Sequence, residues 1–352
     1  MGPRRGRPVP TTGDDELDRR IAELLELTGA HQDRDLLTEI LTTATELARD
    51  AADRADLKIA SASLAEMRRA FRVFAPYRDA PKATMFGSAR TRVDDPLYDQ
   101  ARAMAQALAA EGWMVVTGAG PGIMEAGMAG AGRERSFGVN IQLPFETGAN
   151  EVIAGDEKLV DMKYFFTRKL MLVKESRAFV ALPGGFGTLD EVFELLTLMQ
   201  TGKAVPAPVV LLDVPGGTYW REFERFVDGE LLARGLVSPE DRRLYLVTDD
   251  VDAACREIMH FWSTFDSLRY VGGRLVVRLR RELTDAQIDE LNARFPELPR
   301  RGRIERTDPL PAEVADDDRL DRPRLVLRID LRRVGELRTF VDALNELGAG
   351  AA

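Results

Sequence analysis

Three glycine-containing segments of the sequence have the composition of anion-binding loops. They are FGSAR at residues 86–90, TGAGPGIMEA at residues 117–126 and LPGGFGTLDE at residues 182–191. Glycine lacks a Cβ atom and tolerates positive φ, so a backbone N–H group can come close to a phosphate. The second and third segments also lead directly into predicted helices, whose N-termini attract negative charge. Two such turns on separate strands of one sheet predict a phosphate-binding site.

These segments match neither of two common nucleotide-binding motifs. The second segment begins with Gly-x-Gly, like the dinucleotide fingerprint, but a Pro-Gly pair follows and the fingerprint is incomplete. The next predicted strand, residues 136–142, does not end in the acidic residue that would bind a ribose. The third segment lacks the Gly-Lys-Ser/Thr ending of a P-loop. NAD and ATP chemistry are therefore both disfavoured.

An acidic pair at the end of the third segment is a candidate for chemistry. We expect Thr188 at the N-cap of the following helix and Asp190 and Glu191 in its first turn. The helix dipole alone favours acids at such positions, so a purely structural role is equally compatible with the pattern. The glycine loop directly before Glu191 favours a role in chemistry, because it would hold a ligand beside that carboxylate.

A cationic pair, Arg168-Lys169, interrupts the otherwise mostly apolar run at residues 164–173. An adjacent Arg and Lys on a helix usually form a solvated face. Burying a guanidinium without an anion is costly, however, and the surrounding apolar residues favour burial here. The pair is therefore a second candidate for anion binding, although chain connectivity alone does not bring Arg168 to the third glycine segment.

The composition excludes several classes of function. The chain has 49 Lys and Arg against 58 Asp and Glu, and its net charge of −9 disfavours a dedicated nucleic-acid binder. One cysteine and two distant histidines disfavour a disulfide framework, a zinc site and a Ser-His-Asp triad. No apolar run approaches the roughly 20 residues that span a bilayer, and the N-terminus has no signal-peptide pattern. We expect a cytoplasmic protein without nucleic-acid or membrane partners.

The elements that must position these residues alternate between short apolar strands and amphipathic helices. Predicted strands cover residues 83–86, 113–117, 136–142, 178–182, 208–212 and 244–247, and predicted helices cover residues 96–111, 121–133, 159–175, 188–200, 219–234 and 251–265. Apolar strands without polar alternation suit a parallel sheet that is buried on both faces. We therefore predict an α/β fold, a Rossmann-like doubly wound parallel sheet. Ligands bind such sheets beyond the carboxyl ends of the strands, where the strand order reverses.

The predicted Rossmann-like nucleotide-binding catalytic domain covers residues 80–266 and is flanked by two further segments. Residues 1–12 are expected to be a disordered tail and residues 13–79 a helical extension. The extension has a helical stretch from Asp14 to about Ala52 that breaks near Gly29, and another from about Ile59 to Phe74. Residues 267–352 predict a small α+β C-terminal unit of unassigned function, for which regulation or oligomerisation is a hypothesis. Its expected elements are strands at 274–279 and 324–329, helices at 284–295 (N-cap Thr284) and 334–347, and a long loop at 296–323.

At these residues the chain resembles a known family. Residues 183–191 match the PGGxGTxxE signature of the Lonely guy family of cytokinin riboside 5′-monophosphate phosphoribohydrolases, often mislabelled lysine decarboxylases. The segment around Arg168 and Lys169 resembles the family's second signature, and residues 118–126 resemble its first glycine loop. The resemblance covers about residues 80–262, in a long form with N- and C-terminal extensions. Phe166 replaces the common His, and Asp190 replaces the first Glu of a frequent Glu-Glu pair, which bears on substrate choice more than on reaction type.

The resemblance implies hydrolysis of the N-glycosidic bond of a purine or N6-modified adenine nucleoside 5′-monophosphate, with no metal ion and no cofactor. Glu191 would stabilise an oxocarbenium-like state and activate water. Arg168 would hold the phosphate or assist departure of the base, and Glu125 would contact ribose hydroxyls or only complement its helix end. The remaining expected substrate or phosphate contacts are Gly87, Ser88, Gly118, Gly120, Gly122, Lys169, Gly184, Gly185, Gly187 and Thr188.

The resemblance also implies a homodimer or a larger homo-oligomer. Apolar residues 170–172 and 195–199 are candidates for a dimer seam, or for the buried side of a core helix. Two other classes of function stay open. The terminal extensions favour a non-catalytic protein of the same fold that binds a nucleotide or carries molybdenum cofactor. Single-stranded DNA binding is disfavoured by the acidic balance and by the lack of a basic stripe with interleaved aromatic residues.

Overall fold

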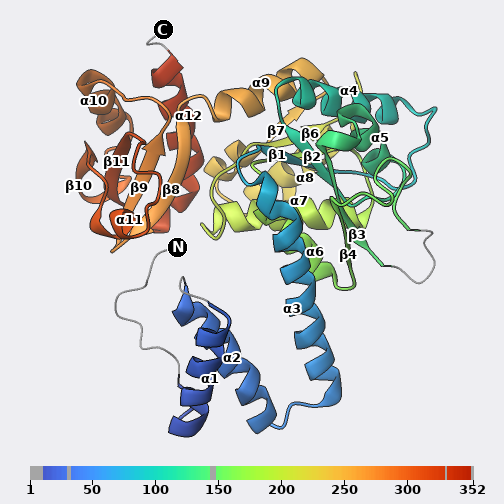
Figure 1. The fold of residues 1–352 in the computed structure, drawn as a ribbon. Helices are drawn as coiled ribbons and strands as arrows, with labels where there is room; N and C mark the ends of the chain where they lie inside the picture. Colours follow the sequence, from blue (N-terminus) through green and yellow to red (C-terminus); the bar gives the residue numbers. More distant parts are fainter. Residues whose placement is uncertain (1–10, 30–32, 143–147, 330, 350–352) are drawn as a thin grey trace. The chain divides into compact units, whose positions relative to one another are not determined.

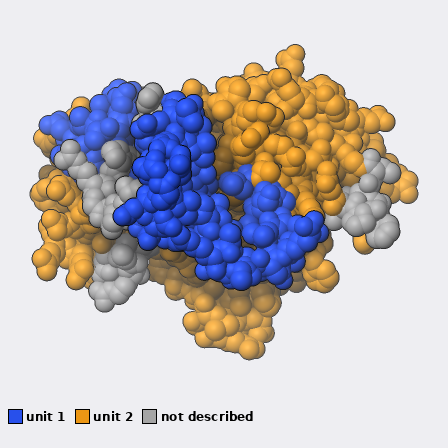
Figure 2. All heavy atoms as spheres, turned by 60° about the horizontal axis from the view of Figure 1, so that its bottom comes forward, with its two compact units in different colours: residues 1–64, 307–322 blue, residues 65–306, 323–352 orange. Residues whose placement is uncertain are grey.

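The computed structural model describes residues 11–29, 33–142, 148–329 and 331–349. The chain divides into two compact units, coloured separately in Figure 2: residues 1–64 with 307–322, and residues 65–306 with 323–352. The boundary between the units falls within the helix α3 (Arg54–Phe74). Most of the expected disordered tail, residues 1–10, lies outside the described residues. Thr12 at its end is buried, and its hydroxyl donates to Asp18 at 2.8 Å.

The first unit contains α1 (Asp15–Leu27), α2 (Arg34–Arg49), the beginning of α3 and the short α11 (Pro311–Ala315). The break between α1 and α2 lies where the sequence predicts it. The predicted start of the next helix at Ile59 is wrong, because α3 begins at Arg54. The side chain of Asp53 accepts the backbone N–H groups of Ala55 at 2.6 Å and Asp56 at 2.9 Å, and so caps the helix there.

A seven-stranded parallel sheet belongs to the second unit (Figure 1). Its strands are β1 (Lys82–Phe86), β2 (Met114–Thr117), β3 (Ser136–Ile141), β4 (Leu159–Met162), β5 (Ala178–Ala181), β6 (Val209–Leu212) and β7 (Leu246–Thr248). They lie in the order β4-β3-β2-β1-β5-β6-β7, and every neighbouring pair is parallel. The strand order reverses between β1 and β5. The predicted Rossmann-like doubly wound α/β fold is confirmed.

Helices cover both faces of this sheet, which explains its uniformly apolar strands. α4 (Pro96–Ala110), α5 (Ile123–Ala131) and α9 (Val251–Phe261) share one core with strand residues such as Met85 and Val115. α3, α6 (Phe165–Lys174), α7 (Phe186–Gln200) and α8 (Tyr219–Phe226) share the other core with Phe86 and Val116. Adjacent strand residues point to opposite faces and are buried on both. No helix within the described ranges is long and apolar enough to cross a bilayer.

Three predicted boundaries in this layer are wrong. The predicted helix at 159–175 begins as β4, an edge strand that pairs with β3, and α6 starts only at Phe165. β4 keeps Asp161 exposed and is only four residues long, so its sequence carries a weak strand pattern. The predicted helix at 219–234 is α8 followed by a π-helical stretch, Val227–Leu232. The predicted helix at 251–265 ends at Phe261.

A second, antiparallel sheet lies after α9 in the chain (Figure 1). Its strands β8 (Phe265–Val271), β9 (Arg274–Leu279), β10 (Pro299–Arg306) and β11 (Arg324–Ile329) lie in the order β10-β11-β9-β8. The helices α10 (Asp285–Arg294) and α12 (Leu337–Ala349) confirm two predicted elements, and Thr284 caps α10 as expected. The expected loop at 296–323 is wrong, because it contains β10 and α11. β10 is an edge strand with a proline, a glycine and exposed arginines, so it lacks the usual strand pattern.

Candidate functional site

The three glycine segments lie at the carboxyl ends of three adjacent strands, β2, β1 and β5. Backbone hydrogen bonds join them: Ser88 N–H donates to the Pro183 carbonyl at 3.3 Å, and Ile123 N–H donates to the Ser88 carbonyl at 3.1 Å. The first segment therefore connects the other two. This edge of the sheet includes the β1/β5 reversal of strand order, where doubly wound sheets bind their ligands.

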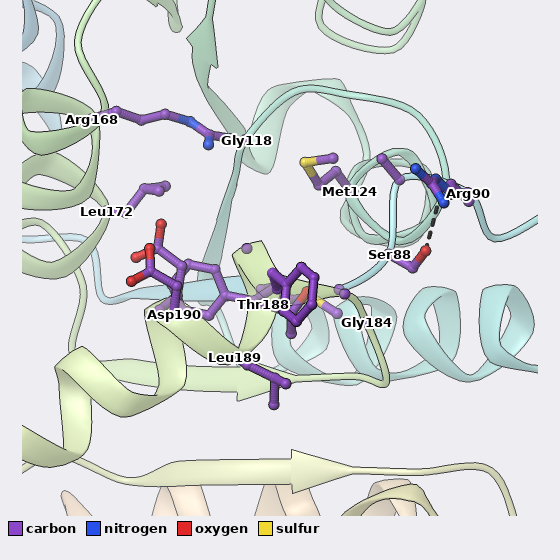
Figure 3. A pocket seen from close by; sticks show the side chains of 18 of the residues that line it. Ser88, Arg90, Gly118, Met124, Arg168, Leu172, Gly184, Thr188, Leu189 and Asp190 are labelled. Carbon is purple, nitrogen blue, oxygen red and sulfur yellow. Dashed lines mark hydrogen bonds between the residues drawn. The ribbon is translucent and has the colours of Figure 1, made fainter.

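A cavity of about 730 Å³ opens between these segments and α6. Figure 3 shows it from close by, with Arg168 and Gly118 on one side and Gly184, Thr188 and Asp190 on another. Nine residues with a predicted role in the site line it: Gly87, Ser88, Gly118, Arg168, Gly184, Gly185, Gly187, Thr188 and Glu191. The fold thus brings Arg168 and the third segment to one cavity, which their order along the chain does not require.

The third segment is the capped end of α7. The helix begins at Phe186 with Gly185 as its N-cap, so the prediction of Thr188 as N-cap is wrong. A glycine cap has no side chain with which to satisfy the first N–H groups of the helix, and these groups are left for a ligand. Asp190 and Glu191 consequently lie one turn further along than expected. The helix-dipole explanation for an acid at these positions does not apply there.

Glu191 is a buried carboxyl group on the cavity wall, with only 7% of its surface exposed. Among the described residues, no donor lies within hydrogen-bonding distance of its Oε2 atom. Burial raises the pKa of Glu191 from 4.5 to about 7, and the positive charges of Lys169 and Arg168 oppose that rise. A carboxyl group with a pKa near neutrality can both accept and return a proton, which is the property that a general acid–base catalyst needs.

Arg168 reaches the cavity from the first turns of α6. Its Nε atom donates to the Val139 carbonyl of β3 at 2.9 Å, which fixes the base of the guanidinium. The far end of the guanidinium lies against the α-carbon of Gly118, where a Cβ atom would overlap it. Gly118 is therefore needed for the approach of the Arg168 side chain, independently of any ligand.

Comparison with known proteins decides the family. A family profile described as "Possible lysine decarboxylase" matches residues 108–258. The cytokinin riboside 5′-monophosphate phosphoribohydrolase of Mycobacterium tuberculosis is 31% identical over 161 residues, which cover 46% of this chain and 84% of that protein. The chain belongs to the Lonely guy family. The resemblance inferred from the PGGxGTxxE signature is thereby confirmed.

Other members of the Lonely guy family match over shorter stretches. An Arabidopsis thaliana cytokinin riboside 5′-monophosphate phosphoribohydrolase is 34% identical over 101 residues, which cover 29% of this chain and 45% of that protein. The chain thus spans about half the length of this plant relative. Among solved structures, the molybdenum cofactor binding protein from Rippkaea orientalis is 20% identical with a TM-score of 0.37, and covers 51% of this chain and 95% of its own.

Four residues expected to bind substrate do not line the cavity in this Lonely guy protein: Gly120, Gly122, Glu125 and Lys169. Gly122 has a φ of +68°, and a Cβ atom there would overlap the Ser88 carbonyl, so this glycine serves loop packing. Lys169 pairs with Asp190 at 2.9 Å and with Glu194. Glu125 acts electrostatically on Tyr98, whose pKa is raised first by burial and then by this charge.

Two residues near the cavity were missed in the sequence. Arg90 lines the cavity at the end of the first segment, and its place in the same segment, two residues after Ser88, was the available signal. Tyr219, at the start of α8, donates its hydroxyl to the Gly184 carbonyl at 2.7 Å. Its N–H donates to Asp213 at 3.0 Å, so the third segment is held from β6 and α8. No local pattern signals a contact between residues so far apart in the chain.

The raised pKa of Glu191 predicts how the free energy of unfolding depends on pH, whether or not the protein catalyses the proposed reaction. Between pH 4.5 and about 7 the folded protein holds a proton on Glu191 that the unfolded chain has released, so stability falls as pH rises through this window. We expect wild type to lose about 2 kcal/mol relative to Glu191→Gln when pH is raised from about 5.5 to about 8. Urea unfolding of both proteins at the two pH values measures this difference. An unchanged difference would contradict the raised pKa.

Proposed function

We propose that the protein hydrolyses the N-glycosidic bond of a purine or N6-modified adenine nucleoside 5′-monophosphate to the free base and ribose 5-phosphate. The observation that carries the proposal is a buried carboxyl group with a near-neutral pKa, Glu191, in the same cavity as a glycine-capped helix N-terminus. The first feature suits acid–base chemistry and the second suits a phosphate. Relatives that carry the name cytokinin riboside 5′-monophosphate phosphoribohydrolase support the same reaction.

The phosphate would be bound by the backbone N–H groups of Gly185 to Thr188, with the hydroxyls of Thr188 and Ser88 as further donors. Added Cβ atoms at Gly185 and Gly187 would meet nothing within 4 Å, so neither glycine is required by local packing. Gly184 differs, because a Cβ atom there would overlap the Thr188 side chain. The free space above Gly185 and Gly187 would let a phosphate reach the backbone of the helix N-terminus.

The reaction adds water across the bond between C1′ and the base nitrogen. Cleavage passes through an oxocarbenium-like state, which a negative carboxylate stabilises. Glu191 in its ionised form would stabilise this charge and take a proton from the attacking water, whose oxygen bonds to C1′ as the bond to the base nitrogen breaks. That proton would then pass to the base nitrogen, which leaves Glu191 ionised again. Arg168, whose guanidinium lies beside Gly118 on the same cavity, would assist departure of the base or hold the phosphate.

Incubation with AMP and N6-modified AMP tests this function. We expect free base and ribose 5-phosphate in equal amounts by chromatography. Because Gly185 has space for a Cβ atom, Gly185→Ala should cost no more than about 1 kcal/mol of stability, from the poorer N-cap. It should raise the KM for the nucleotide at least about tenfold by blocking a charge-assisted contact. Gly229→Ala is the matched control, since that glycine is also without close neighbours and lies away from the cavity.

Two results would contradict the proposal. A nucleotide or molybdenum cofactor that stays bound through purification, with no hydrolysis over a panel of monophosphates, would favour a non-catalytic binding or carrier protein. A wild-type KM in folded Gly185→Ala would place the phosphate away from the N-terminus of α7.

We propose that the protein forms a homodimer or a larger homo-oligomer. Residues 195–199 were one candidate for the dimer seam. Leu195 and Met199 of this stretch lie in the core, so these two side chains form the buried side of a core helix instead. Around α6 and the start of α7, by contrast, apolar side chains are exposed: Phe165, Phe166, Leu170 and Phe186, the last at 93%. Large exposed apolar groups of this kind mark interfaces. A monomer mass from light scattering would contradict this proposal.

A further inference from the structure

A buried carboxyl group in α3 contacts the helix that carries Arg168. Glu66 has 2% of its surface exposed and lies outside the residues matched by the family profile. Its Oε1 atom accepts the backbone N–H of Lys163 at 3.0 Å, and its Oε2 atom accepts the hydroxyl of Thr167 at 2.6 Å. Thr167 is fully buried and immediately precedes Arg168. Both acceptor atoms of Glu66 are therefore used on the N-terminal end of α6.

α6 has little capping of its own. Its N-cap residue, Tyr164, makes no side-chain capping hydrogen bond, and its first turn contains no acidic residue. The first N–H groups of any helix lack intrahelical partners, and a negative group near them is favourable. Glu66 places a carboxyl group from another helix at this end of α6, bonded to the N–H of Lys163 just before the helix and to the side chain of Thr167 in its first turn. A helix end held in this way is less free to fray or to rotate.

The position of α3 is itself fixed against the same part of the fold. Phe74, at the end of α3, stacks on Phe137 of β3 with ring centroids 4.5 Å apart. Phe71 of α3 lies under the Lys174 ammonium, 5.1 Å from its ring centroid, at the other end of α6. β3 also provides the Val139 carbonyl that accepts the hydrogen bond from Arg168. α3 therefore contacts α6 at both ends, next to the strand on which the guanidinium is anchored.

We infer that Glu66 is a positioning residue for Arg168: α3 fixes the N-terminal end of α6 through Glu66 and so sets where the guanidinium enters the cavity. The expected effect of Glu66 on turnover rests on the proposed function. The structural half of the inference, the immobilisation of α6 by Glu66, does not depend on the reaction. The part of α3 that belongs to the second unit thus takes part in positioning the site.

The test uses the full-length protein and two substitutions of similar size. Glu66→Met removes both acceptors. Glu66→Gln can still accept the Lys163 N–H and can donate to the Thr167 oxygen, whose own hydroxyl hydrogen then goes to the Tyr164 carbonyl, 2.9 Å away. We expect Glu66→Met to lose at least about tenfold in kcat, as expected for a disturbed catalytic geometry, and Glu66→Gln to stay within about threefold of wild type.

A double-variant cycle separates positioning from a general loss of stability. If Glu66 acts through Arg168, then adding Glu66→Met to Arg168→Met has no further effect on kcat. An equal fold-loss in both backgrounds overturns the inference. Ile258→Val, a fully buried residue of α9 in the other core, controls for lost stability and should leave kcat unchanged. If Glu66→Met does not fold, Thr167→Val removes one of the two hydrogen bonds and Thr167→Ser keeps it.

Hydrogen exchange tests the inference even where the reaction fails. In protein without substrate, the amides of residues 163–168 should exchange at least about tenfold faster in Glu66→Met than in wild type, and at the wild-type rate in Glu66→Gln. Exchange that is unchanged in Glu66→Met overturns the inference. Faster exchange in a protein that hydrolyses no monophosphate upholds the immobilisation of α6 and rejects the proposed function instead.

Discussion

We expect Glu191→Gln to hydrolyse a nucleoside 5′-monophosphate about 10³-fold more slowly than wild type, with its affinity for the nucleotide retained. The loss is large because a positioned acid–base group contributes about 10² to 10⁴ in rate, and because the amide cannot carry the negative charge that an oxocarbenium-like state requires. A factor of 10³ corresponds to about 4 kcal/mol of transition-state stabilisation. Single-turnover kinetics and equilibrium binding of AMP measure the two quantities separately.

The pH dependence of wild type gives the same test a second readout. Because the pKa of Glu191 is about 7, its carboxyl group is mostly protonated below that pH and cannot accept a proton from water. The value of kcat/KM should therefore rise with pH and level off above about 7. The residual activity of Glu191→Gln should lack this rise.

Glu194→Gln is the matched control for Glu191→Gln. The same chemical change is made on the same helix, but Glu194 does not line the cavity and pairs with Lys169. We expect Glu194→Gln to keep activity within about tenfold of wild type, because the ion pair that it weakens is partly exposed and Lys169 keeps its second partner, Asp190. Equal losses in Glu191→Gln and Glu194→Gln would show that disturbance of α7, and not the loss of a catalytic carboxylate, causes the defect.

Local sequence pattern predicts the α/β layer well because strands buried on both faces are short and uniformly apolar. It fails at β4, β8 and β10, three strands at the edges of their sheets. β4 runs into the apolar start of α6, and β10 contains a proline, a glycine and four arginines. Pairing with a neighbouring strand, which no local pattern encodes, makes these segments strands.

In the candidate site, too, local sequence patterns predict some features, whereas contacts between residues far apart in the chain determine others. Glycine content identifies the three loops, and the spacing in the third segment singles out Glu191. The N-cap of α7 is misplaced by three residues because a glycine N-cap carries no side-chain signal, whereas Thr188 does. The contacts of Glu66 with α6 and of Tyr219 with Gly184 join distant parts of the chain. These contacts depend on how the helices pack against the sheet, and a single sequence does not predict them.

Replacing Arg168 by methionine should reduce kcat about 100-fold, which is typical for removal of one preorganised donor from an active site. The two roles open to Arg168 differ in what they predict. The guanidinium lies beside Gly118, and its charge acts on Glu191, while the N-terminus of α7 offers separate donors for a phosphate. We therefore expect the defect in kcat, with KM and the affinity for ribose 5-phosphate changed less than about threefold. A raised KM with wild-type kcat would instead assign Arg168 to the phosphate.

The pH profile of Arg168→Met distinguishes this role from general damage. Arg168 opposes the raised pKa of Glu191, so its removal should move that pKa further above about 7 and shift the rising limb of kcat/KM to higher pH. Lys169→Met is the comparison, since Lys169 opposes the rise more strongly but lies outside the cavity. Lys169→Met should also shift the rise of kcat/KM to higher pH. Its kcat above that rise should stay closer to the wild-type value than that of Arg168→Met. Arg168→Lys keeps the charge without the planar fork, so it should restore the position of the limb but not the full rate.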